Sequence, residues 1–185
     1  MRVLWITVIL AVLLGACGGG DGDLSAEDQR LADAIAAQLT EDDDGPPVRQ
    51  AEAQCFGDRT VDKIGADRLD ELGLGLAAVQ AGTSPSDVDL DDGDVETMLD
   101  AFMDCVDFGQ LFTDGLLEDA GGAVSEGSAR CIAEGIDDDF IRSAARGGIT
   151  GDESSAEPDA EALSEIFGLM ADCLSPEELQ AVTGG

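Results

Sequence analysis

The feature of this 185-residue chain that most constrains its fold is a repeat built around cysteine pairs. The residues around Cys105 recur around Cys173 at a constant offset of 68 positions (173 − 105). At this offset six apolar residues correspond to six others: Val95, Met98, Leu99, Phe102, Met103 and Val106 to Leu163, Ile166, Phe167, Met170, Ala171 and Leu174. A weaker similarity begins at Cys55 and Cys131. Agreement over several helical turns predicts two copies of one structural unit.

These four cysteines are predicted to form two disulfide bonds. An even number of cysteines is typical of an exported, disulfide-bonded domain. A structural zinc site is the competing use, but it needs ligands much closer in sequence, and the chain has no histidine. If each copy folds locally, Cys55 pairs with Cys105 and Cys131 pairs with Cys173. Four cysteines allow three pairings, and the sequence leaves the other two open.

Apolar residues recur with the period of a helix along most of the chain, and no sustained alternation indicates a strand. The sequence therefore predicts an all-α fold. Ser25, with Asp28 three residues later, is predicted to cap the first helix, and Ser175 with Glu178 to cap the last. Residues 81–94 and 147–159 are expected to be mobile loops. The predicted helices cover residues 26–39, 51–64, 67–72, 95–106, 110–119, 128–135, 138–146 and 159–174, followed by a turn from 175.

The N-terminus has the pattern of an export signal. Arg2 precedes an apolar stretch over residues 3–14, which is too short to span a membrane permanently. The stretch ends in Leu13-Leu14-Gly15-Ala16-Cys17, which resembles the lipobox of bacterial lipoproteins. The resemblance implies that residues 1–16 are removed and that lipid is attached to Cys17, holding the chain on the extracytoplasmic face of the cell membrane. An ordinary secretory signal is the alternative.

The predicted organisation follows from these features. Residues 1–16 form the signal peptide, 17–24 a flexible tether, and 25–47 an N-terminal helix with an acidic Pro loop. The first Cys-pair unit covers 48–120 and the second covers 121–185. The surroundings of the cysteines resemble the paired-Cys helical units of uncharacterised exported actinobacterial proteins, a resemblance that implies no particular activity.

Acidic residues dominate the composition, with 41 Asp and Glu against 9 Lys and Arg and a net charge of −32. Nucleic acid is excluded as a partner because binding it needs a basic surface. Attraction to anionic lipid is excluded for the same reason, so lipid on Cys17 is the expected membrane contact.

One acidic segment, Asp87 to Asp94, alternates carboxylates as calcium loops do. Counted from Asp87, however, Gly93 and Met98 stand where such a loop needs other residues. We predict no metal site and no cofactor, with Asp94 capping the next helix. Weak binding of divalent cations stays open.

Catalytic residues are scarce in this composition. Without histidine there is no Ser-His-acid or Cys-His nucleophile, and the cysteines are assigned to lipid and disulfides. The sequence predicts that the chain is not an enzyme. We expect a non-catalytic binding or interaction module with an envelope protein as its partner. The alternatives are a structural or cation-buffering acidic envelope protein and a small solute-binding component of a transporter, for which the 169 residues (185 − 16) after the signal are few.

Overall fold

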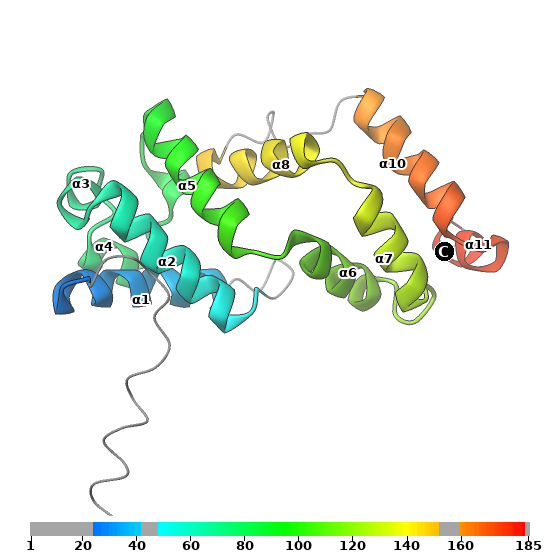
Figure 1. Ribbon diagram of the computed structural model, residues 1–185, viewed down its shortest axis with the longest axis horizontal. Helices are drawn as coiled ribbons and strands as arrows, with labels where there is room; N and C mark the ends of the chain where they lie inside the picture. The colour runs from blue at the N-terminus through cyan, green and yellow to red at the C-terminus, as the bar shows by residue number, and fades with distance from the viewer. Residues whose placement is uncertain (1–23, 42–47, 152–159, 184–185) are drawn as a thin grey trace, which may run out of the picture.

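The computed structural model describes residues 24–41, 48–151 and 160–183, and in these ranges the chain is helical without strands (Figure 1). The part of the chain up to Cys105 holds α1 (Ala26–Glu41), α2 (Gln50–Ile64), α3 (Ala66–Glu71), α4 (Leu76–Gln80), the 3-10 turn η1 (Pro85–Asp87) and α5 (Asp92–Cys105). The rest of the chain holds α6 (Phe108–Asp119), α7 (Glu126–Gly135), α8 (Asp138–Thr150), α10 (Ala160–Cys173) and α11 (Pro176–Thr183). The all-α fold is as predicted.

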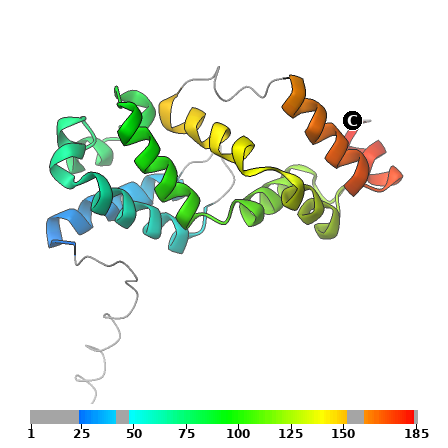
Figure 2. The ribbon, with the colours of Figure 1, turned by 45° about the horizontal axis from the view of Figure 1, so that its top comes forward.

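Two groups of helices lie side by side along the longest axis of the molecule. The helices α1 to α5 form one end, and α6, α7, α10 and α11 form the other, in both ribbon views (Figures 1 and 2). Each group has its own buried cluster of apolar side chains. The central residues of the two clusters are Leu31, Ala32, Val61, Leu69, Leu74, Val79 and Met98 in one, and Val124, Ala129, Ile132 and Leu174 in the other.

In the first group, α1 packs closely along α2. Gly57 permits this close approach, because a Cβ at that position would lie 2.3 Å from the carbonyl oxygen of Ala32. Polar residues then join the two helices at their exposed edge, where the Gln29 amide donates to Asp58 Oδ1 at 2.9 Å and the Gln54 amide donates to Asp33 Oδ1 at 3.0 Å.

In the second group, α6 packs along α7 much as α1 packs along α2. Phe112, Leu116 and Leu117 of α6 contact the cluster around Ile132. Residues 110–119, which the sequence predicts to belong to the first unit, contribute these partly buried side chains to the second group. Helix α6 comes after the first cysteine pair in the chain. Only a short turn separates α6 from α7, so α6 folds back onto α7.

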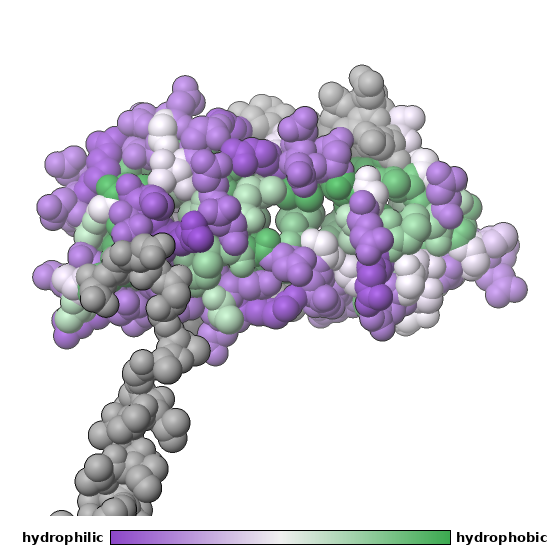
Figure 3. All heavy atoms as spheres, in the orientation of Figure 1, coloured by the Kyte–Doolittle hydropathy of each residue, from purple (hydrophilic) through white to green (hydrophobic). Residues whose placement is uncertain are grey.

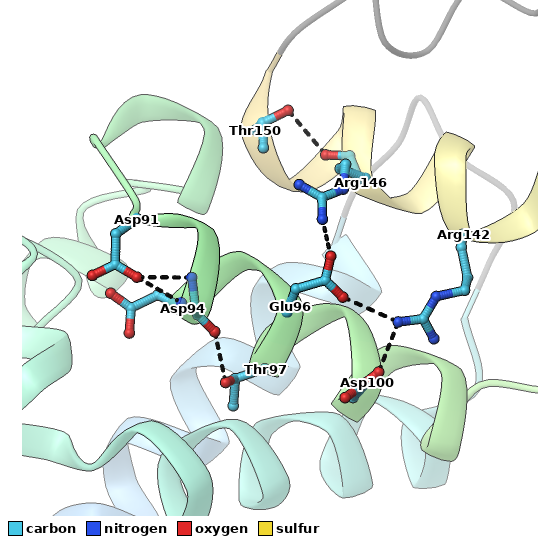
Figure 4. A network of polar contacts seen from close by, with 9 residues as sticks. Asp91, Asp94, Glu96, Thr97, Asp100, Arg142, Arg146 and Thr150 are labelled. Carbon is cyan, nitrogen blue, oxygen red and sulfur yellow. Dashed lines mark hydrogen bonds and ion pairs between the residues drawn. The ribbon is translucent and has the colours of Figure 1, made fainter. Parts of the chain in front are cut away.

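One helix of the second unit returns to the first group. Helix α8 packs on α5 and η1, and its Ile149 contacts the first apolar cluster. Above α5, Arg142 donates to Asp100 at 2.8 Å, and both Arg142 and Arg146 bond to Glu96 (Figure 4). The two units are therefore joined by helix packing as well as by the chain.

The predicted helix caps and helix boundaries can be compared with the observed ones. The capping boxes at Ser25 and Ser175 form as predicted. The helix α4 and the turn η1 were not predicted, and α5 begins at Asp92 instead of 95. The prediction that Asp94 caps α5 is wrong. Asp91 is the N-cap, since its carboxylate accepts from the backbone N–H of Gly93 and Asp94 at 2.9 and 3.0 Å.

The second predicted loop, residues 147–159, is also partly helical within the described residues. Helix α8 continues to Thr150, where the prediction ended it at 146, and Gly151 then adopts a left-handed conformation with φ 65°. The rest of the predicted loop, from 152 to 159, lies outside the described residues.

Candidate functional site

The four predicted disulfide cysteines lie together in two pairs. Cys55 of α2 is bonded to Cys105 of α5, with 5.5 Å between their Cα atoms, and Cys131 of α7 is bonded to Cys173 of α10, with 5.7 Å between theirs. These are the pairs expected if each copy folds locally. Each bond joins the helix that opens a copy to the helix that closes it. Disulfides indicate that the chain folds in an oxidising, extracytoplasmic compartment.

The predicted lipid attachment residue, Cys17, lies outside the described residues. The same is true of the predicted signal peptide and of most of the predicted tether. Within the described ranges, no helix is long and apolar enough to span a membrane. Lipidation of Cys17 stays a prediction from the sequence.

The acidic segment from Asp87 to Asp94 uses its carboxylates locally. Asp87 accepts from the backbone N–H and the hydroxyl of Ser84, bonds that lower its pKa. Hydrogen bonding by the backbone N–H of Asp94 lowers the pKa of Asp91, and Arg68 pairs with Asp91 at 3.0 Å and with Asp94 at 2.8 Å. The described residues contain no group of three or more Cys, Asp or Glu side chains that could hold a metal ion. The segment is thus built to cap η1 and α5 and to pair with Arg68.

A groove between α1 and α4 is a candidate site for a ligand. It has a volume of about 500 Å³, within the range of small-molecule sites. One face of α1 forms its first wall, because the residues there are spaced as successive turns of a helix. The end of α4 and the turn after it form the second wall. The lining residues are Arg30, Asp33, Ala34, Ala37 and Gln38 from α1, and Val79, Gln80 and Gly82 from the other wall.

Gln38 holds the two walls of this groove together. Its side-chain amide donates to the backbone carbonyl of Val79 at 2.7 Å and to that of Thr83 at 3.1 Å. Val79 belongs to the last turn of α4, and Thr83 lies in the segment that follows the helix. Gly82, with φ 92°, lets the backbone turn immediately after α4. A specific side-chain contact thus links the two walls of the groove.

Arg30 distinguishes the groove electrostatically. The described ranges contain eight Lys and Arg side chains, and seven of them form ion pairs: Arg49, Arg59, Lys63, Arg68, Arg130, Arg142 and Arg146. Arg30 forms no ion pair with any described residue. Arg30 lines the groove together with the apolar residues Ala34, Ala37 and Val79. The groove also contains Asp33, whose carboxylate accepts from the side-chain amides of Gln29 and Gln54. Such a groove can bind the apolar part of a small molecule while Arg30 pairs with an anionic group.

Exposed apolar side chains are few on the described surface. Figure 3 shows the hydrophilic colour over most of one face, with apolar surface in the middle and toward the α10 end. Two large apolar side chains stand out by their exposure, Phe167 on α10 at 63% and Val182 on α11 at 42%. Both lie at the end of the molecule opposite the groove.

Comparison with protein-family models, with curated proteins and with solved structures finds no match for this chain. The site must therefore be argued from its own residues. Sequence reasoning missed Arg30 and the groove. The helical spacing of residues 30 to 38 could have indicated one face of α1, but the opposite wall belongs to α4, a five-residue helix without a predicted start or end.

Proposed function

We propose that this chain is a lipid-anchored, extracytoplasmic binding protein without catalytic activity, and that the groove between α1 and α4 binds a small molecule with an apolar body and an anionic end. The observation that carries the proposal is Arg30, which lines the groove of a strongly acidic chain and forms no ion pair with any described residue. The groove residues offer hydrogen bonds, apolar contact, the positive charge of Arg30 and the negative charge of Asp33, and none of them is a nucleophile paired with a base. This supports reversible binding. A small solute-binding component of a transporter would use such a groove in the same way.

A medium-length carboxylate tests the groove directly. We expect octanoate to bind the full chain in a calorimetric titration at 0.15 M NaCl, where surface repulsion is screened, and neutral octanol to bind more weakly. Because a hydrogen bond to a charged group contributes about 1.5–3 kcal/mol, Arg30→Gln should weaken octanoate binding about tenfold or more.

Arg59→Gln is the matched control, because Arg59 is paired with Asp104 at 2.7 Å and does not line the groove. It should bind octanoate as the natural chain does. Equal weakening by both substitutions, or no binding of octanoate at all, would show that the groove is not the ligand site.

The lipid anchor is tested separately by Cys17→Ala. Lipid on Cys17 provides stable attachment when two or more acyl chains insert, and the acidic surface adds no attraction to anionic lipid. We expect the Cys17→Ala protein in the soluble fraction or as an uncleaved precursor, with its helical domain folded. Normal processing together with firm membrane attachment would contradict the anchor.

Acidity favours a second candidate function, a structural or cation-buffering role in the envelope. The net charge of −32 means that most carboxylates have no cationic partner available. Calcium titration by calorimetry separates this role from specific binding. Many weak, equivalent sites would support buffering, whereas the absence of any heat of binding would exclude it.

A further inference from the structure

Helix α10 exposes a face that carries no charge. This outer face consists of Ser164, Phe167, Gly168 and Ala171, which follow one another at helical spacing and are all exposed. Phe167 at its centre is 63% exposed. The other side of α10 packs on α7, where Met170 and Cys173 contact the second apolar cluster. In a chain with 41 acidic residues, an uncharged helix face with a large exposed aromatic ring is a candidate contact surface.

The repeat shows what the same face does in the first unit. At the offset of 68, the outer face of α10 corresponds to Glu96, Leu99, Asp100 and Met103 on α5. There α8 covers the face, Leu99 is only 2% exposed, and Glu96 and Asp100 bond to the arginines of α8 (Figure 4). This surface of the repeat is thus a helix-packing surface, and it is covered in one copy and open in the other.

The charge and size of the side chains on the outer face determine which kind of helix can pack on it. Ser164 and Gly168 stand where α5 has Glu96 and Asp100, so a helix with arginines like α8 would find no carboxylates there. The face instead suits a second α10 in antiparallel orientation. A two-fold axis between residues 167 and 168 places Phe167 of each copy on Gly168 of the other, and Ser164 on Ala171. The large Phe167 ring then packs over Gly168, which has no side chain, and the small side chains of Ser164 and Ala171 pack against each other.

We propose that two copies of this chain associate through the outer faces of their α10 helices, related by this two-fold axis. Such an interface is self-complementary, as a two-fold dimer requires. Gly168 has open space around it, since a Cβ there would meet no atom within 4 Å of its own chain. It can therefore receive the Phe167 ring of the second copy.

Charge and area set the strength of this dimer. Each copy carries a net charge of −32, and repulsion between the copies is screened over about 8 Å at 0.15 M salt. One pair of helices also buries less surface than a stable, permanent dimer does. The association is accordingly weak and becomes stronger as the salt concentration rises.

Sedimentation equilibrium of the full chain in detergent, at 0.05 and 0.5 M NaCl, tests the dimer. We expect dimerisation at 0.5 M and a dissociation constant that rises about tenfold or more with Phe167→Asp, which removes the ring and adds a charge. Val182→Asp is the matched control, because Val182 is also an exposed apolar residue but lies on α11. It should dimerise as the natural chain does.

A second substitution tests the register of the pair. Gly168→Leu has room in the single chain and should leave its circular dichroism and thermal unfolding intact, but it fills the position that receives Phe167 of the second copy. We expect it to abolish the dimer. A monomer at both salt concentrations, or a dimer equally weakened by Val182→Asp, would overturn the proposal, and a dimer that survives Gly168→Leu would overturn the two-fold pairing.

Discussion

Two buried threonines show how a single hydroxyl affects stability. Thr60 on α2 is 1% exposed, and its hydroxyl has no hydrogen-bond partner among the described residues, whereas Thr113 on α6 is 5% exposed and donates to the carbonyl of Gly109 at 2.7 Å. An unbonded buried hydroxyl costs free energy that an isosteric methyl group does not. We expect Thr60→Val to raise the free energy of unfolding by about 1 kcal/mol, measured by urea denaturation.

Thr113→Val provides the comparison. It removes a hydrogen bond that is made, so it should lower the free energy of unfolding by about 1 kcal/mol. Equal effects of the two substitutions would mean that the Thr60 hydroxyl has a partner in solution.

Glu178 couples the last helix to α7 through its ionised carboxylate. It accepts from the backbone N–H of Ser175 and Ser125, at 2.8 and 2.7 Å, and from the Ser128 hydroxyl. Hydrogen bonds from Ser175, followed by those from Ser125, lower the pKa of Glu178 from 4.5 to about 2. Because the pKa is lower in the folded state, the stabilisation is complete above pH 4.5 and is lost as the pH falls from 4.5 towards 2.

Glu178→Gln should therefore be less stable than the natural chain at pH 6, and the difference should shrink as the pH falls to 3. Denaturation with urea at both pH values measures this. Glu177→Gln, which removes an exposed carboxylate from the same turn, is the control and should show no such pH-dependent difference. A carboxyl titration of Glu178 with a midpoint above 4 would contradict the prediction.

At the scale of elements, Gly57 lets α2 approach the backbone of α1 closely. Gly57→Ala places a methyl group against the backbone of Ala32, and backbone cannot move aside as a flexible side chain can. We expect it to lower the free energy of unfolding by about 2–3 kcal/mol. The matched substitution is Gly148→Ala in α8, where the new Cβ meets nothing within 4 Å. It should instead raise the free energy of unfolding by about 0.5–1 kcal/mol through helix propensity. Thermal unfolding of both variants measures whether each substitution stabilises or destabilises the chain.

The elements themselves were largely predictable, and the exceptions at α4, η1 and the start of α5 have two causes. Long helices such as α1, α2 and α10 carry several turns of apolar periodicity, and the caps at Ser25 and Ser175 are local hydrogen bonds that neighbouring residues specify. The missed elements, α4 and η1, have five and three residues and too few turns to show a period. The start of α5 was misplaced because Asp91 and Asp94 are both good caps, and only the backbone conformation selects Asp91.

At the scale of the whole molecule, the two disulfides differ in how readily a reductant reaches them. Cys131 is exposed, whereas Cys55 and Cys105 are both half-buried. We expect mild reduction to open the bond between Cys131 and Cys173 first, since exposed disulfides are reduced more readily. Stepwise reduction, alkylation and peptide mapping measures the order, and earlier alkylation of Cys55 would contradict it. Each opened bond should lower the free energy of unfolding by up to about 4 kcal/mol on the chain-entropy model.

The sequence by itself determined the helical class, the cysteine repeat, the acidic composition and the N-terminal run ending at Cys17 that resembles a lipobox. These features depend on composition or on residues close together in the chain, and local physics is sufficient to interpret them. The pairing within each copy also followed from the sequence, although only by assuming that each copy folds as a unit.

Only the tertiary structure decided which helix faces meet. It placed α6 on α7, brought α8 back over α5, opened the groove beside Arg30 and left Phe167 exposed where its counterpart Leu99 is buried. Each of these depends on contacts between residues tens of positions apart. Periodicity shows that a helix has an apolar face, but the free energy of burying that face is similar against several partners, and the choice among them is made by packing in three dimensions.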